Sequence, residues 1–239
     1  MAKPAKPATE GLAEAMPHYL GHRERVRDRL EKVGAENFTD AELLEALLHV
    51  VIPRKDTKPL AKELLKRFGS VGAVLAAPKS ELADFKGLGD TTIANLKVIR
   101  AAAQRMTRDS IETDKPVLSS WQSLIDYCMA QMAHERIEQF RILFLDKKNR
   151  LIADEVQQRG TVDHTPVYPR EVIKRTLELS ATALILVHNH PSGDPAPSSA
   201  DVQMTRQIND IARPLGITLH DHIIIGRNGH ASLKALKLL

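Results

Sequence analysis

The sequence predicts a two-domain protein of the α+β class, with an all-helical N-terminal domain followed by a C-terminal α/β domain. Through residues 21–106, apolar side chains recur at the three- and four-residue spacing of a helix. From residue 117 onward, strand-like and helix-like segments alternate. The stretch between them, residues 107–116, is polar and charged and ends in proline, which is typical of a linker. The 239 residues, of which 43% are hydrophobic, are enough for two packed cores.

Residues 1–20 are predicted to be a flexible tail, because Ala, Pro and Lys dominate their first part and large apolar side chains are few. The helical domain follows over residues 21–106. One apolar face runs from Leu43 to Val51 and another from Leu60 to Phe68, as expected of helices that pack together. We expect about five helices, separated at residues that interrupt a helix: Gly34, Pro53, Gly69 and Gly87.

Residues 117–239 are predicted to form the C-terminal domain, in which strands and helices alternate. We find no internal repeat. The predicted elements, in chain order, are a helix over Trp121–Met132, two strands on either side of the turn Asp146–Asn149, a helix over Pro169–Leu179, a buried strand over Ala183–Val187, a helix over Ser199–Ala212, and strands near Ile217–Ile225 and His230–Leu233.

Composition and charge limit the class of protein. No apolar run approaches the about 18 residues of a membrane span, and residues 1–8 carry charge without the apolar core of a signal peptide. The single cysteine, Cys128, excludes a disulfide scaffold. We therefore expect a cytoplasmic protein with no membrane partner.

The most informative segment is Val187–Asp201, which offers two imidazoles and a carboxylate at a spacing suited to one divalent metal. Side chains alternate along a strand, so His188 and His190 at the strand end are expected to point the same way. Asp201 falls in the first turn of the following helix and is expected to face back toward them. Three protein ligands with an open fourth position are typical of a catalytic zinc site, and one cysteine cannot build a closed thiolate site.

A structural interpretation of the same residues stays open. Ser198 and Asp201 also make an N-cap and a first-turn acid at a helix start. A histidine at a strand end is often a polar residue packed at the edge of a core. The asparagine between the two histidines does not indicate an HNH nuclease, whose metal site is built on a hairpin followed by a helix.

His188-x-His190-Pro191 and, six residues later, Ser198-x-x-Asp201 resemble the JAMM (MPN+) metalloprotease signature, and the whole segment closely resembles bacterial RadC proteins. The resemblance covers about residues 21–239. It implies a cytidine-deaminase-like α/β sandwich for the C-terminal domain. Further segments that carry the resemblance are Arg159–Val162, Pro169–Val172 and Asp221–Gly226.

The resemblance also implies the remaining parts of a hydrolytic site. It implies one Zn²⁺ per chain on His188, His190 and Asp201, and an upstream glutamate that takes a proton from the activated water. Glu138 is the best candidate for that base, with Glu135 and Glu171 as alternatives. It implies that the Ser198 hydroxyl donates a hydrogen bond to the oxyanion of the intermediate, a role that competes with capping the helix.

Two functions of different class follow. The first is a zinc metallohydrolase that cleaves a peptide or isopeptide bond in a protein substrate. The second is a DNA-associated protein of repair or recombination whose metal domain is not catalytic. A metal-dependent nuclease is a third reading, although such enzymes often use two metals and no second carboxylate cluster lies near the histidines in the sequence.

Gly87-Leu88-Gly89 resembles the turn of a helix-hairpin-helix element, which presents backbone N–H groups to a nucleic-acid phosphate. Residues 1–106 hold 18 Lys and Arg against 14 Asp and Glu, whereas residues 107–239 hold 16 of each. DNA is therefore an expected partner, bound through the N-terminal domain. Asp90 departs from the usual pattern and would repel phosphate, and a plain tight turn between packed helices explains the glycines equally well.

Overall fold

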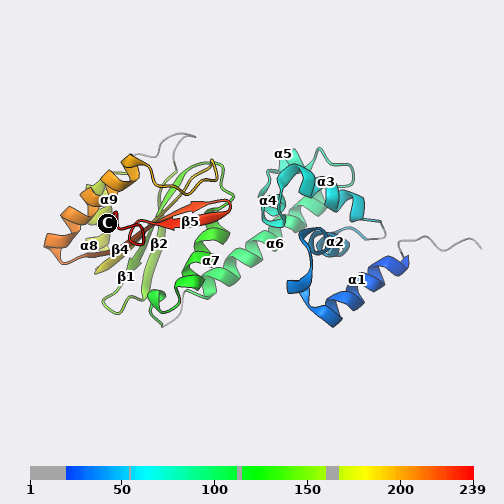
Figure 1. The fold of residues 1–239 in the computed structure, drawn as a ribbon, viewed down its shortest axis with the longest axis horizontal. Coiled ribbons are helices and arrows are strands. Elements are labelled where there is room, and N and C mark those ends of the chain that lie inside the picture. Colours follow the sequence, from blue (N-terminus) through cyan, green and yellow to red (C-terminus); the bar gives the residue numbers. More distant parts are fainter. Residues whose placement is uncertain (1–19, 54, 112–114, 160–166) are drawn as a thin grey trace, which may run out of the picture. The chain divides into compact units, whose positions relative to one another are not determined.

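The computed structural model describes residues 20–53, 55–111, 115–159 and 167–239 (Figure 1). The chain divides into two compact units between Leu96 and Lys97. The tail predicted for residues 1–20 lies outside the described residues except for Leu20, which begins the first helix. Gly160–Val162 of the family-like segments also lies outside them. No described helix has the length and apolar character needed to cross a membrane.

The first unit is helical. Its described elements are α1 (Leu20–Val33), the 3-10 turn η1 (Ala35–Asn37), α2 (Asp40–Val51), α3 (Lys58–Phe68), α4 (Val71–Ala76), α5 (Lys79–Leu82) and the start of α6 (Asp90–Asp109). The breaks predicted at Gly34, Pro53, Gly69 and Gly87 are confirmed. The two apolar faces meet in a core that includes Leu44, Leu48 and Leu64, each fully buried.

One helix count and one boundary differ from the prediction. The described part of the first unit has six α-helices, one more than expected, because α4 and α5 are too short to show a clear helical period. The linker was predicted to begin at residue 107, whereas α6 continues to Asp109. Residues 90–109 contain neither glycine nor proline, so nothing in the sequence interrupts that helix.

The second unit is built on a five-stranded mixed sheet in the order β2-β1-β3-β4-β5. Its strands are β1 (Gln139–Leu145), β2 (Leu151–Arg159), β3 (Ala183–Asn189), β4 (Thr218–Gly226) and β5 (Gly229–Ser232). Only β3 and β4 are parallel; the other described pairs are antiparallel. The predicted strands are confirmed, together with the predicted helices α7 (Trp121–Met132), α8 (Pro169–Glu178) and α9 (Ser199–Ala212).

Each face of the sheet has its own apolar core, and Figure 1 shows α7 and the pair α8 and α9 on opposite sides. The alternation of β3 explains this arrangement. Ile185 and Val187 pack with α7, whereas Leu184 and Leu186 pack with α8 and α9. All seven residues of β3 are buried, as expected of a central strand covered on both faces. His188 continues the face that looks toward α9.

Candidate metal centre

The two histidines are delivered by the carboxyl end of β3. His188 is the sixth residue of the strand, lies between Phe140 of β1 and Ile224 of β4, and is 1% exposed. His190 follows the strand and is held there by its backbone N–H, which donates to the Ile225 carbonyl at 2.9 Å. The two Nε2 atoms lie 2.9 Å apart. The predicted common orientation of the two side chains is therefore confirmed.

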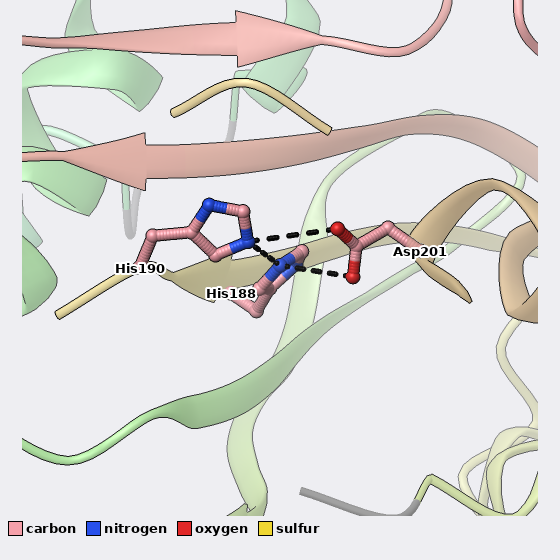
Figure 2. A group of neighbouring side chains, drawn as sticks. All are labelled: His188, His190 and Asp201. Atoms are coloured by element: carbon pink, nitrogen blue, oxygen red, sulfur yellow. Dashed lines mark hydrogen bonds and ion pairs between the residues drawn. The ribbon is translucent and has the colours of Figure 1, made fainter. Parts of the chain in front are cut away.

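Asp201 reaches the histidines from the first turn of α9, as predicted. Its Oδ1 lies 3.3 Å from the His188 Nε2, and its Oδ2 lies 3.5 Å from the His190 Nε2 (Figure 2). The ligand atoms of the three residues all lie within 4.8 Å of one another. Two imidazole nitrogens and a carboxylate that converge on one point form a donor set that fits a divalent metal such as zinc.

The proton of His190 is placed on the ring nitrogen that faces away from this point. Its Nδ1 lies 2.8 Å from the Asp194 carbonyl oxygen, which can only accept a hydrogen bond, so Nδ1 carries a hydrogen and the Nε2 lone pair is available to a metal. The loop that supplies this carbonyl is itself fixed, since Arg227 donates to the carbonyls of Pro191 and Gly193. A side chain at Gly226 would collide with Gly193.

Burial and charge set the protonation of the three groups. Burial lowers the pKa of His188 to about 4, against the opposing charge of Asp201. The hydrogen bond with Asp201 raises the pKa of His190 above its ordinary 6.5. Burial acts to raise the pKa of Asp201, but the hydrogen bonds from His190 and Ser198 and the field of His188 outweigh it and lower that pKa. At neutral pH the site therefore combines a neutral His188 with an anionic Asp201.

Ser198 is the N-cap of α9, as one of its two predicted roles requires. Its Oγ accepts from the Asp201 N–H at 3.1 Å, and its hydroxyl donates to the Asp201 Oδ2 at 2.7 Å. The Ser198 N–H donates to the same carboxylate oxygen at 2.7 Å and completes a capping box. The residue that offers a carboxylate to the histidines is thus held by the start of its own helix.

Glu138 lies directly before β1, and its negative charge is among the influences that raise the pKa of His190. The Glu135 carboxylate pairs with Arg100 at 2.7 Å and accepts from the Gln139 side chain at 3.1 Å. Glu171 is exposed on α8 and pairs with Arg170 at 3.3 Å. Of the three, Glu138 is the one whose charge acts on His190.

Asn189 lies between the two histidines, is 1% exposed, and has a role that its sequence context did not predict. Its side chain points to the segment that precedes β1. Its Oδ1 accepts from the Gln139 N–H at 2.9 Å, and its Nδ2 donates to the carbonyls of Glu135 and Ile137 at 3.3 and 3.2 Å. These contacts bracket Glu138, so Asn189 ties the candidate base to the strand that carries the candidate ligands. The signal that could have revealed it is an amide side chain that directly continues a buried apolar strand.

The turn proposed for DNA lies in the first unit, between α5 and α6. Gly87 has a φ of +105°, which favours glycine, and Leu88 is buried in the core of that unit. Gly89 precedes α6, and a Cβ at this position would meet no atom within 4 Å. Asp90 pairs with Lys79 at 3.0 Å. The predicted turn is thus present, and Asp90, whose charge would repel phosphate, forms an ion pair with Lys79.

Two family models match the chain. A RadC-like JAB domain matches residues 118–238, which include all the candidate ligands and both predicted catalytic residues. The chain belongs to the RadC family. A UPF0758 N-terminal domain matches residues 18–94, in the helical unit. A RadC-like JAB domain with this His-His-Asp group supports a metal site.

We predict that the purified RadC-family chain binds about one zinc, and that His188→Ala or His190→Ala abolishes it, because three ligands cannot easily spare one. Elemental analysis after dialysis measures the metal content. His230→Ala is the matched control, since His230 is an exposed histidine on β5, and it should keep the metal. Full zinc content in a His188→Ala, His190→Ala double variant would show that the ion binds elsewhere.

The pKa shifts predict how zinc binding depends on pH. Metal binding requires neutral imidazoles. The pKa of His190 is raised, so this ring is protonated first, and the affinity should fall by about tenfold per pH unit below that pKa. His188, with a pKa of about 4, should add no second proton above pH 5. Chelator competition between pH 5 and 8 measures the slope, and about a hundredfold loss per unit would contradict the assignment.

Proposed function

We propose that this protein is a cytoplasmic zinc-dependent hydrolase that cleaves a peptide or isopeptide bond in a protein substrate. The observation that carries the proposal is the convergence of three ligand atoms from His188, His190 and Asp201, with the charge of Glu138 acting on His190. The donor set leaves room for a fourth ligand, as in catalytic rather than structural zinc sites. Bound Zn²⁺ would supply Lewis-acid chemistry and lower the pKa of a water from about 16 to about 7.

The protein residues would then carry the proton. Glu138 accepts the proton of the attacking water and later gives it to the leaving amine, acting as general base and then as general acid. The contacts of Asn189 with Glu135, Ile137 and Gln139 limit the movement of the segment that holds Glu138. A base held in this way needs little rearrangement before the reaction.

The two roles of Ser198 use different parts of its hydroxyl. Capping α9 needs only the oxygen, which accepts from the Asp201 N–H. The hydrogen donates to the Asp201 Oδ2, and rotation of the hydroxyl would release it while the oxygen stays in place. It can then donate to the oxygen of the scissile carbonyl as negative charge develops there. Capping and stabilisation of the oxyanion are therefore compatible.

We predict that Glu138→Gln keeps the zinc and lowers hydrolysis by a factor on the order of 10² to 10⁴, since the amide keeps the shape of the side chain but cannot accept a proton. Peptide, isopeptide and DNA substrates, each with and without a chelator, measure the activity and its class. Glu171→Gln is the matched control and should retain the activity of the unchanged protein.

An unchanged turnover in Glu138→Gln would move the base to Glu135 or Glu171. Cleavage of DNA alone would favour a nuclease. A zinc-loaded protein that cleaves none of the three substrates would favour the reading in which the metal domain is not catalytic.

Association with DNA is a second candidate function, in repair or recombination, through the turn Gly87-Leu88-Gly89. It is supported by the Lys79–Asp90 ion pair, which offsets the one acid at the turn, and by the open space around Gly89. Backbone N–H groups at the start of α6 could then approach a phosphate closely.

We predict that the full chain binds duplex DNA without sequence preference, with an affinity that falls steeply as salt rises, because each neutralised phosphate releases counterions. Gly89→Val should weaken binding by blocking the approach of the backbone. Fluorescence anisotropy measures the affinity, and circular dichroism checks the fold. Ala102→Val adds similar bulk at an exposed position of α6, about 20 Å along the helix, and should bind as before. Absence of binding at low salt would leave the turn with a structural role.

A further inference from the structure

Behind the candidate ligands lies a second set of polar groups, one on β4 and one on α9. His222 of β4 and Thr205 of α9 are both fully buried. The His188 Nδ1 lies 2.8 Å from the His222 Nε2, and the His222 Nδ1 lies 2.5 Å from the Thr205 Oγ1. The Thr205 Oγ1 in turn lies 2.6 Å from the backbone carbonyl oxygen of Asp201. The four groups form one continuous hydrogen-bonded row.

The row has a single direction, which its last member sets. A carbonyl oxygen only accepts, so the Thr205 hydroxyl donates its one hydrogen to Asp201. Thr205 must then accept from His222, which places the hydrogen of a neutral His222 on Nδ1 and leaves a lone pair on Nε2. That lone pair accepts from the His188 Nδ1. His188 therefore carries its hydrogen on Nδ1 and turns the lone pair of Nε2 toward His190 and the Asp201 carboxylate.

We propose that Thr205 and His222 are positioning residues that hold His188 in the tautomer able to bind a metal through Nε2. This inference rests on the metal centre of the proposed function and deepens it. In the opposite tautomer, the His188 Nε2 would carry a hydrogen at the point where the three ligand atoms meet, and the imidazole could not coordinate.

The comparison with His190 shows why His188 needs two residues behind it. The Nδ1 of His190 faces a carbonyl oxygen, which accepts whatever its surroundings are. His188 faces another imidazole, which can either donate or accept. The contact with Thr205 decides whether the His222 Nε2 donates to His188 or accepts from it. Groups behind a metal-bound histidine fix its ring and its proton in this way.

Asp201 takes part at both ends of the row. Its carboxylate lies beside the His188 Nε2, and its backbone carbonyl receives the Thr205 hydroxyl that ultimately orients the His188 Nδ1. The contacts thus close a loop through β3, β4 and the first turns of α9. A shift of α9 would remove a ligand and release the tautomer of another at the same time.

The test uses the full chain and replaces Thr205. Thr205→Val keeps the shape and removes the hydroxyl, so the affinity for zinc, measured by chelator competition, should fall by about 10- to 100-fold. Thr205→Ser keeps the hydroxyl and should restore the affinity. Thr176→Val is the matched control, because Thr176 is fully buried in α8 and bonds the carbonyl four residues earlier in the same way. It should bind zinc like the unchanged protein.

A second measurement reports the tautomer directly and can be made on the unchanged protein, so it does not require that a variant folds. Nitrogen-15 NMR of the histidine rings in the metal-free, unchanged chain should show the His188 Nδ1 protonated and its Nε2 without hydrogen. Thr205→Val should show a mixture of the two forms. A hydrogen on the His188 Nε2 of the unchanged chain, or equal zinc affinity in Thr205→Val, would overturn the inference. If the chain binds no zinc at all, the proposed function is refuted. The NMR measurement is made without metal, so it still decides the tautomer in that case.

Discussion

The meeting of the first turn of α9 with the carboxyl end of β3 is the contact on which the candidate site depends. Asp201 makes this contact through its carboxylate, which lies beside His188 and His190. Asp201 is itself held by the capping box with Ser198 and by Thr205, which donates to its backbone carbonyl. A capping box fixes where a helix starts. The same hydrogen bonds that begin α9 therefore also set the position of a metal ligand.

A fully buried strand that ends in polar residues is costly unless each polar group has a partner. In β3, Ala183–Val187 is apolar and packs on both faces, while His188 and Asn189 are equally buried. Their partners lie on opposite sides, because successive side chains alternate: His188 bonds His222, and Asn189 bonds the segment before β1. The cost of burial is thus met by hydrogen bonds that also organise the site.

The sequence predicted those parts of the structure whose signals are local. The period of apolar residues placed α7, α9 and the sheet strands, and it failed at the short helices α4 and α5, which span little more than one turn each. His188, His190 and Asp201 lie within 14 residues, so their spacing could be read directly. Thr205, His222 and Asn189 could not be assigned roles, because their partners come from other elements and depend on strand register. Glu138 was reached only through the family resemblance.

The difference between a metal-binding module and a hydrolase lies in what surrounds the ligands. Two histidines and an aspartate suffice to hold an ion, and their pairing alone says little about catalysis. A hydrolase also needs a base held at a fixed place relative to the metal. Here His188 and His190 point toward Asp201. Asn189, between them, forms hydrogen bonds with the backbone on either side of Glu138. These hydrogen bonds satisfy the buried Asn189 side chain, and in the proposed hydrolase they would also hold the base at a fixed place relative to the ligands.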